Sequence, residues 1–296
     1  MEFKKCLVCK TVVVILSLYA SLSTVAASAF EVFDGTHYIE KPEMSAYGVR
    51  PLTIVYAAKF WPEGKGMDGL PLKENVLSTA RDADKRGVMV VLDVEHWPLS
   101  RVADSQIEVH LYMYQTILEW FREGAPKTQV GYYGHAPLGD YWRAIRGAGN
   151  RDYNDWQREN NRIVALAAKV DVLFPSLYTA KPDQQGWVKV AVENIKEARR
   201  LGNGKPVYVF LWPLYDDNPA TEKNMVHTYI GSNFWTLQLE TAKAHADGAI
   251  IWGGWDLKKN KPMIWDDSAP WWKDTKEFMS SIGQSRPSPP TSLNLR

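Results

Sequence analysis

Short apolar runs alternate with longer amphipathic stretches along the chain between residues 52 and 252. The runs are continuously β-branched or aromatic, which is typical of strands that are covered on both faces. Six of them predict strands: LTIVYA (52–57), VMVVLDV (88–94), QVGYYG (129–134), VLFPSLY (172–178), PVYVFLW (206–212) and GAIIWG (248–253).

The stretches between the runs have the periodicity of helices. Asp104 or Ser105 caps the first one, which repeats apolar residues at spacings of three and four. Further helices are predicted over 152–168, 187–201 and 235–246. Regular alternation of strand and helix indicates a parallel α/β fold, and no G-x-G-x-x-G follows the first strand. We therefore expect a single TIM-like (β/α) barrel of seven or eight parallel strands.

The two ends of the chain have a different composition. Residues 1–29 begin with Lys4 and Lys5, continue through an apolar stretch over 11–22 and end in the small residues Ala-Ser-Ala, as a signal peptide does. An uncleaved N-terminal anchor is the alternative. Residues 283–296 are rich in proline and serine and are expected to be a disordered tail. The barrel then occupies 30–282 of a secreted or periplasmic monomer that has no membrane segment after cleavage.

Composition excludes several kinds of chemistry. Both cysteines, Cys6 and Cys9, lie in the signal segment, so the mature chain would carry no disulfide and no reactive thiol. It would keep 32 basic and 33 acidic side chains, a balance that argues against nucleic acid as a partner. His96 and His135 belong to no metal-binding pattern, so no metal and no other cofactor is expected.

Polar and aromatic clusters recur where the predicted strands end. In a (β/α) barrel the carboxyl ends of the strands carry the catalytic residues. Five such clusters in succession therefore predict an active site at this end: DVEHW (93–97), YYGH (132–135), PSLYT (175–179), LWPLYDD (211–217) and WGGWD (252–256).

Asp93 and Glu95 stand two residues apart at the end of one strand, so their side chains point the same way, with Cα atoms about 6.6 Å apart. Two carboxylates on one wall cannot easily straddle a sugar ring, as the pair of an ordinary glycosidase does. One can instead hold the other protonated as a general acid, while the substrate's own 2-acetamido oxygen attacks. A purely structural role, with Asp93 capping a turn and Glu95 paired with an arginine, is the alternative.

These blocks resemble the hyaluronidase family of glycoside hydrolases over roughly residues 50–256. That family has I-D-x-E-x-W, G-Y/F-Y-G, Y/F-P-S-x-Y, Y-D and L-W-x-x-W, and this chain has L-D-V-E-H-W, G-Y-Y-G, F-P-S-L-Y, L-Y-D and I-W-G-G-W in the same order. The resemblance implies that Glu95 donates the proton and that Asp93 orients the acetamido group. It further implies that Tyr178 and Tyr215 hold the acetamide and the adjacent sugar, on a floor formed by Trp252.

Other aromatic residues near the strand ends are candidate sugar contacts, with ordinary core packing as the alternative for each. Trp97 and Trp212 are candidate stacking platforms, and only one of the neighbours Tyr132 and Tyr133 can face the interior, of which Tyr132 is taken as the contact. Asp256 is a candidate partner for a sugar hydroxyl or a loop cap. If the acetamide does not attack, Asp256 is also the first protein nucleophile to consider.

Two departures from the family limit the resemblance. Animal hyaluronidases have an arginine just after the E-x-W tryptophan, where this chain has Pro98 and Leu99, and they have barrel disulfides. The resemblance therefore supports the reaction better than it supports hyaluronan as the substrate. We expect a retaining, substrate-assisted glycoside hydrolase acting on an N-acetylhexosamine polysaccharide. A non-catalytic polysaccharide-binding barrel and a polysaccharide lyase are the alternatives.

Overall fold

The structure is a computed structural model that describes residues 29–284. The expected signal peptide, except for its last residue, and residues 285–296 of the expected tail lie outside the described residues. The last helix, α8 (Pro270–Gln284), continues two residues past the predicted end of the barrel domain at 282.

The central strands are all parallel to one another. They form two sheets, ordered β2-β1-β7-β6 and β3-β4-β5, and a short antiparallel pair, β8-β9, follows β7. The bounds are β1 (Glu31–Thr36), β2 (Arg50–Pro51), β3 (Thr53–Tyr56), β4 (Val90–Asp93), β5 (Val130–Tyr132), β6 (Tyr208–Leu211), β7 (Gly248–Gly253), β8 (Trp255–Asp256) and β9 (Lys261–Pro262).

The two sheets are connected at both edges, although not by continuous ladders. Only Leu52 separates β2 from β3. At the other edge, single parallel bridges join Tyr133 to Phe174 and Ser176 to Phe210, so the predicted strand over 172–178 lies between β5 and β6. The parallel α/β class is thus confirmed, whereas a continuously closed barrel of seven or eight strands is not what the ladders of the described residues form.

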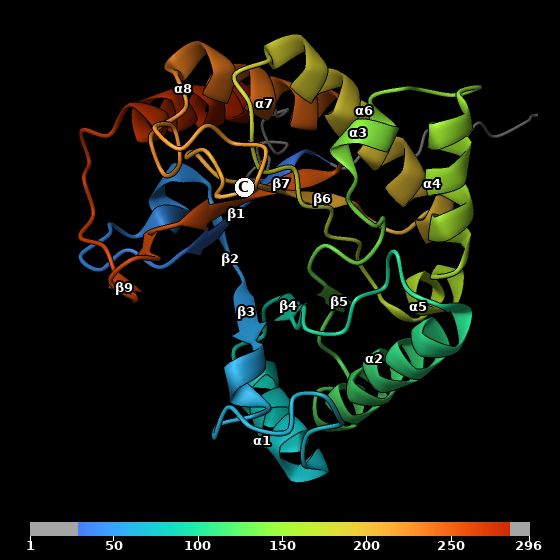
Figure 1. The fold of residues 1–296 in the computed structure, drawn as a ribbon. Coiled ribbons are helices and arrows are strands. Elements are labelled where there is room, and N and C mark those ends of the chain that lie inside the picture. The colour runs from blue at the N-terminus through green and yellow to red at the C-terminus, as the bar shows by residue number, and fades with distance from the viewer. Residues whose placement is uncertain (1–28, 285–296) are drawn as a thin grey trace, which may run out of the picture.

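Helices surround the strands, as Figure 1 shows. They are α1 (Lys73–Asp84), α2 (Asp104–Gly124), α3 (Tyr141–Ala144), α4 (Arg151–Asn161), α5 (Val164–Lys169), α6 (Gln184–Gly202), α7 (Ser232–His245) and α8, with 3-10 turns η1 (Met44–Tyr47) and η2 (Ala57–Lys59). The helix predicted over 152–168 is divided in two at Ile163, whose φ of −103° and ψ of 7° leave the helical range.

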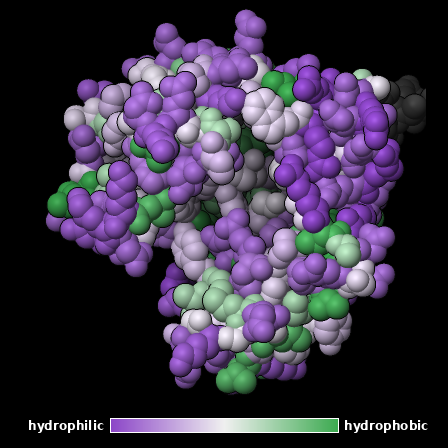
Figure 2. All heavy atoms as spheres, viewed as in Figure 1, coloured by the Kyte–Doolittle hydropathy of each residue, from purple (hydrophilic) through white to green (hydrophobic). Residues whose placement is uncertain are grey.

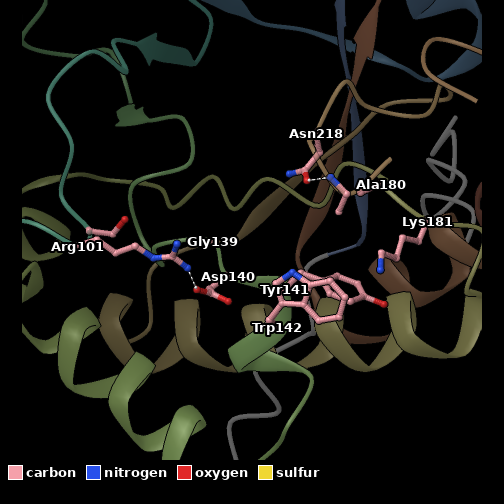
Figure 3. Close-up of a pocket in the computed structure, with 10 residues that line it drawn as sticks. Arg101, Gly139, Asp140, Tyr141, Trp142, Ala180, Lys181 and Asn218 are labelled. Atoms are coloured by element: carbon pink, nitrogen blue, oxygen red, sulfur yellow. Dashed lines mark hydrogen bonds and ion pairs between the residues drawn. The ribbon is translucent and has the colours of Figure 1, made fainter. Parts of the chain in front are cut away.

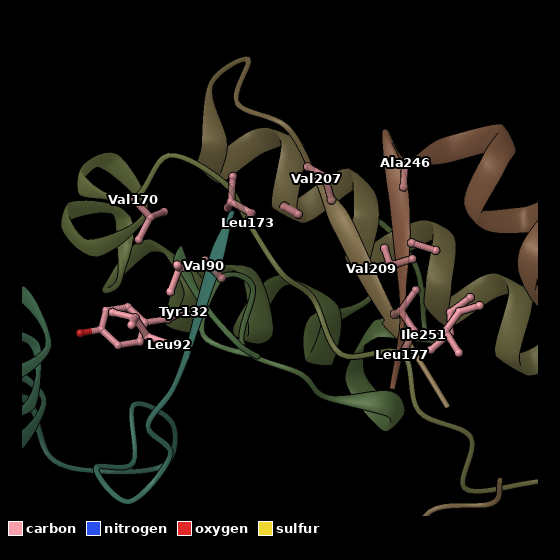
Figure 4. Packing of buried hydrophobic residues seen from close by; sticks show 14 of the residues in the cluster. Val90, Leu92, Tyr132, Val170, Leu173, Leu177, Val207, Val209, Ala246 and Ile251 are labelled. Atoms are coloured by element: carbon pink, nitrogen blue, oxygen red, sulfur yellow. The ribbon is translucent and has the colours of Figure 1, made fainter. Parts of the chain in front are cut away.

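The strands separate two hydrophobic clusters because successive side chains of a strand point to opposite faces. The outer cluster packs between strands and helices and includes Val90, Leu92, Val209 and Ile251 (Figure 4). The inner cluster takes the alternate positions and fills the space that the strands enclose: Phe33, Met89, Val91, Val172, Phe174, Phe210 and Ile250.

Hydrophilic side chains cover most of the face of the molecule that Figure 2 shows, and hydrophobic side chains lie there in small scattered groups. Within residues 29–284, no helix is both long and apolar enough to cross a membrane.

The inner cluster has room for Gly131 only because this residue lacks a Cβ. A Cβ there would lie 2.2 Å from the Val172 carbonyl oxygen and 2.9 Å from the Phe174 ring. Overpacking of a filled core costs roughly 1–3 kcal/mol, so Gly131→Ala should lower the free energy of unfolding by about that amount. Urea denaturation measures it, with Gly69→Ala as control, because the Cβ of that variant meets nothing closer than 3.9 Å. An equal midpoint for the two variants would contradict the tight packing.

Candidate active site

The candidate active site is a cavity at the carboxyl ends of the strands. Most of its side chains occupy the same inward-facing, alternate positions as those of the inner cluster. Asp93 is the next inward position after Val91 on β4, and Glu95, two residues past Asp93 and just beyond the end of the strand, keeps the same direction. The cavity measures about 410 Å³. The side chains that line it come from five strands and the loops that follow them: Ile54, Asp93, Glu95, Tyr133, Ser176, Tyr178, Phe210, Trp212, Asp216, Asp217, Trp252 and Leu257.

The two carboxyl groups line the same cavity, with Asp93 partly buried and Glu95 more exposed. Burial raises the pKa of Asp93 to about 7, helped by the charge of Glu95 and by a hydrogen bond with it. Burial and the charge of Asp216 also raise the pKa of Glu95, while the hydrogen bond from Asp93 lowers it. Below about pH 7 the pair therefore holds one shared proton, and the direction of their hydrogen bond places that proton on Asp93.

The environment of the pair also bears on its alternative, structural role. Within the described chain, no lysine or arginine pairs with either carboxylate. A turn cap or an ion pair would have lowered the pKa of these groups rather than raised it.

Three aromatic rings form the wall beside the carboxylates. The rings of Trp212 and Trp252 lie 4.9 Å apart at an angle of 82°, and Tyr178 lies 5.5 Å and 5.9 Å from them. Trp252 is held in place because its Nε1 donates to the Tyr56 hydroxyl over 3.0 Å, and that hydroxyl lies 2.6 Å from Nε2 of His37. This arrangement suits a sugar ring, because the aromatic rings can pack against its apolar face while the carboxylates bind the polar groups at its edge.

Tyr178 and Tyr133 bring hydroxyl groups to the same wall. The Tyr133 hydroxyl donates to Ser176 Oγ over 2.9 Å and is hydrogen-bonded to Tyr178. Burial raises the pKa of both tyrosines well above the usual value, so both keep their protons at every physiological pH. Tyr133 uses its single hydroxyl proton for Ser176, whereas the Tyr178 hydroxyl can turn from Tyr133 and donate its proton to an oxygen of a bound ligand.

Two predicted sugar contacts lie behind the strands rather than in the cavity. Tyr132 points outward from β5 and donates its hydroxyl to the Tyr114 carbonyl over 2.8 Å, so Tyr133 is the member of the pair that faces inward. Trp97 follows the turn after β4, is buried and donates its Nε1 to the Met67 carbonyl over 2.7 Å. Both residues serve packing, which corrects the sequence-based prediction.

Two further predicted residues lie outside the cavity. Tyr215 points away from it and lines a separate surface hollow with Phe234, whereas its neighbour Asp216 faces inward. Asp256 accepts hydrogen bonds from the backbone N–H groups of Lys258 and Lys259, so it caps the turn between β8 and β9. The loop-cap alternative for Asp256 is the one that the structure supports.

The step of two along each strand identifies the residues that sequence reasoning missed. Asp216 follows the predicted contact Trp212 by four, so it keeps the inward parity of β6. Ser176 keeps the parity of Phe174 in the same way. Among residues 29–284, no group of three or more His, Cys, Asp and Glu side chains is arranged to hold a metal ion.

Comparison with known proteins places the fold. No family model matches the sequence, and no curated protein sequence matches it. Among solved structures, bee venom hyaluronidase matches with a TM-score of 0.58 at 16% identity, covering 86% of this chain and 98% of that one. The same enzyme in complex with a hyaluronic acid tetramer also matches with a TM-score of 0.58 at 16% identity, covering 86% and 96%. The chain therefore shares its fold with a TIM-barrel glycoside hydrolase.

Proposed function

We propose that this protein is a glycoside hydrolase that cleaves an N-acetylhexosamine polysaccharide with retention, using the substrate's acetamide as the nucleophile. One observation carries the proposal: Asp93, at the end of β4, and Glu95, two residues beyond it, are hydrogen-bonded to each other and line a cavity walled by Trp212, Trp252 and Tyr178. The shared fold supports the reaction class.

Glu95 supplies the proton. When a glycosidic oxygen enters beside it, the proton held on Asp93 moves to Glu95, which passes it to the leaving oxygen as the bond to C1 breaks. The ionised Asp93 then accepts a hydrogen bond from the acetamide N–H and stabilises the positive charge that develops there. The acetamide oxygen bonds to C1, and water later opens the cyclic ion from the opposite side while returning a proton to Glu95.

The tyrosine and tryptophan side chains hold the sugar for this attack. The Tyr178 hydroxyl, which stays protonated, can donate to the acetamide oxygen, and Trp252 and Trp212 enclose the methyl end of that group. Enclosure by aromatic rings excludes water, which would otherwise compete with the acetamide.

Asp216 replaces Asp256 as the protein carboxylate to consider if the acetamide does not attack. It lines the cavity from the loop after β6, whereas Asp256 is held in its turn. Burial raises the pKa of Asp216, which makes it a poorer ionised nucleophile at acidic pH than an ordinary aspartate. Its place in the cavity favours a hydrogen bond to a sugar hydroxyl.

The reaction would take place outside the cytoplasm. We infer that residues 1–29 direct export and that the mature protein is a secreted or periplasmic monomer. Cleavage after Ala29 would leave β1, which begins at Glu31, intact. The remaining Phe30 would keep its edge-to-face contact with Phe278.

A substrate screen tests the proposal. Purified protein would be incubated with hyaluronan, chondroitin, chitin oligomers and peptidoglycan, and the products separated by size. We expect shortening of at least one N-acetylhexosamine polymer. Binding without shortening of any polymer would favour the non-catalytic barrel.

The pH dependence follows from the raised pKa values. Because the pair must hold a proton to act, the rate should fall as pH rises through about 7, the pKa of Asp93. Asp93→Asn leaves Glu95 as a single carboxyl group that loses its proton without creating a second adjacent negative charge, so the falling limb should move to lower pH, with a lower maximum. Initial rates between pH 3 and 9 measure both effects. A limb that keeps its position in Asp93→Asn would mean that the two groups do not share a proton.

A further inference from the structure

A second hollow of about 340 Å³ lies on the loops that follow the strands. Its walls come from the loops after β4, after β5, after residues 172–178 and after β6, so it opens at the same end of the molecule as the catalytic cavity. The side chains that define it are Ser100, Arg101, Asp140, Trp142, Lys181 and Asn218 (Figure 3).

This hollow is adjacent to the cavity along two stretches of chain. Lys181 is three residues beyond Tyr178, and Asn218 directly follows Asp217, while Tyr178 and Asp217 both line the cavity. Three residues of extended chain reach at most about 11 Å. A polysaccharide held in the cavity can therefore continue into the hollow.

Trp142 offers an unusually open aromatic surface. It is 53% exposed, whereas Trp212 beside the catalytic cavity is buried. The ring of Tyr141 packs edge-on against it at 5.3 Å, and the Lys181 ammonium lies 4.1 Å from its ring centroid. Lys181 and Trp142 thus form a cation–π contact, and such contacts are weak at exposed sites. A sugar ring can take the place of the ammonium, which then lies beside the sugar.

Arg101 faces this pair from the other side of the hollow (Figure 3). Its φ of 56° is left-handed, a conformation that costs energy in arginine and that clusters at functional sites. The backbone N–H of Arg101 donates to Glu159 Oε1 over 2.7 Å, and its guanidinium donates to Asp140 Oδ2 over 3.0 Å. The Arg101 side chain is still 76% exposed, so its remaining N–H groups can bind another carboxylate.

We propose that this hollow is a distal subsite for a sugar unit that carries a carboxylate. Trp142 stacks on the ring of that sugar, and Lys181 and Arg101 bind its carboxylate from the two sides. That the bound glycan continues from this hollow into the catalytic cavity rests on the proposed function. The binding of an acidic sugar in the hollow does not depend on it. The carboxylate can belong to a uronic acid within the polymer or to an acidic substituent on an amino sugar.

Binding to the Glu95→Gln protein tests the subsite without turnover. Titration calorimetry would use three probes: hyaluronan hexasaccharides, the same oligosaccharides with their carboxylates reduced to alcohols, and peptidoglycan fragments that keep their lactyl-peptide carboxylates. Adding Trp142→Ala should raise the Kd of the preferred acidic probe about tenfold. Adding Lys181→Gln should move that Kd part of the way toward the value for the reduced probe, because Arg101 still binds the carboxylate. Tyr112→Ala, which removes an exposed ring from α2, is the matched control.

The outcomes separate the subsite from the catalytic proposal. Tight binding of the hyaluronan probe assigns a uronate, and tight binding of the peptidoglycan probe assigns an acidic substituent. The subsite is overturned if neither acidic probe binds, if Trp142→Ala binds as the control does, or if Lys181→Gln weakens the acidic and reduced probes equally. Charge-dependent loss in these variants, combined with a wild-type protein that cleaves nothing, would retain the subsite and reject the hydrolase.

Discussion

Glu95→Gln should lower kcat by roughly 10²- to 10⁴-fold, because glutamine cannot protonate the leaving oxygen. The change keeps the size of the side chain and removes a carboxyl group that no lysine or arginine balances within the described residues. We therefore expect the fold to be retained, and KM to change much less than kcat, since the lost proton transfer belongs to the transition state.

The measurement is steady-state turnover of the polymer that the screen identifies, with circular dichroism and thermal melting to show that the variant is folded. Glu240→Gln is the matched control, because this glutamate lies on α7 and is half exposed near Lys243. Turnover of a folded Glu95→Gln protein at the rate of this control would remove Glu95 from the mechanism.

Replacing the 2-acetamido group of the substrate by a hydroxyl should slow cleavage by ~10⁵-fold or more, because it removes the intramolecular nucleophile. The same mechanism predicts a product of retained configuration and inhibition by a thiazoline that mimics the cyclic ion.

Matched aryl glycosides that differ only at C2 measure this effect, and proton NMR of the first product reports its configuration. Equal rates for the two glycosides would reject attack by the acetamide. Asp216, which lines the cavity from the loop after β6 together with Asp217, would then be tested as the nucleophile by Asp216→Asn.

The sequence predicts the interior of this fold well because the strands obey a period of two. Five of the six predicted runs contain assigned strands, and the run over 172–178 pairs through single bridges. The sequence does not predict β1, because EVFDGT contains Glu31 and Asp34 and few apolar residues. Asp34 accepts a hydrogen bond from Lys41 over 2.6 Å, and no local pattern indicates this partner seven residues away.

Five of the predicted site residues come together in the cavity because the period of two continues past the ends of their strands. Asp93, Glu95, Tyr178, Trp212 and Trp252 keep the inward parity of their strands, and all five line the cavity. The resemblance to hyaluronidases indicated a role for Tyr215, but parity favours its neighbour Asp216.

Two of the predicted contacts lie outside the cavity because the chain turns before them, and after a turn the side chains no longer follow the alternation of the strand. Trp97 lies beyond the turn that follows Glu95, and Asp256 follows Gly253 and Gly254, whose positive φ values of 149° and 76° reverse the chain. Such geometry depends on tertiary contacts. Gly254, for example, approaches Tyr38 so closely that a Cβ would lie 2.5 Å from its backbone nitrogen.

The masses of the products formed from an N-acetylhexosamine polymer test the central claim most directly. Mass spectrometry would compare wild-type protein with Glu95→Gln after equal incubation. Hydrolysis through the Asp93–Glu95 pair predicts wild-type fragments that have each gained the elements of water, and none from the variant at the same time point. Fragments that carry a double bond instead of added water would identify a lyase, and an intact polymer that remains bound to the wild-type protein would identify a non-catalytic barrel; either result would contradict the account.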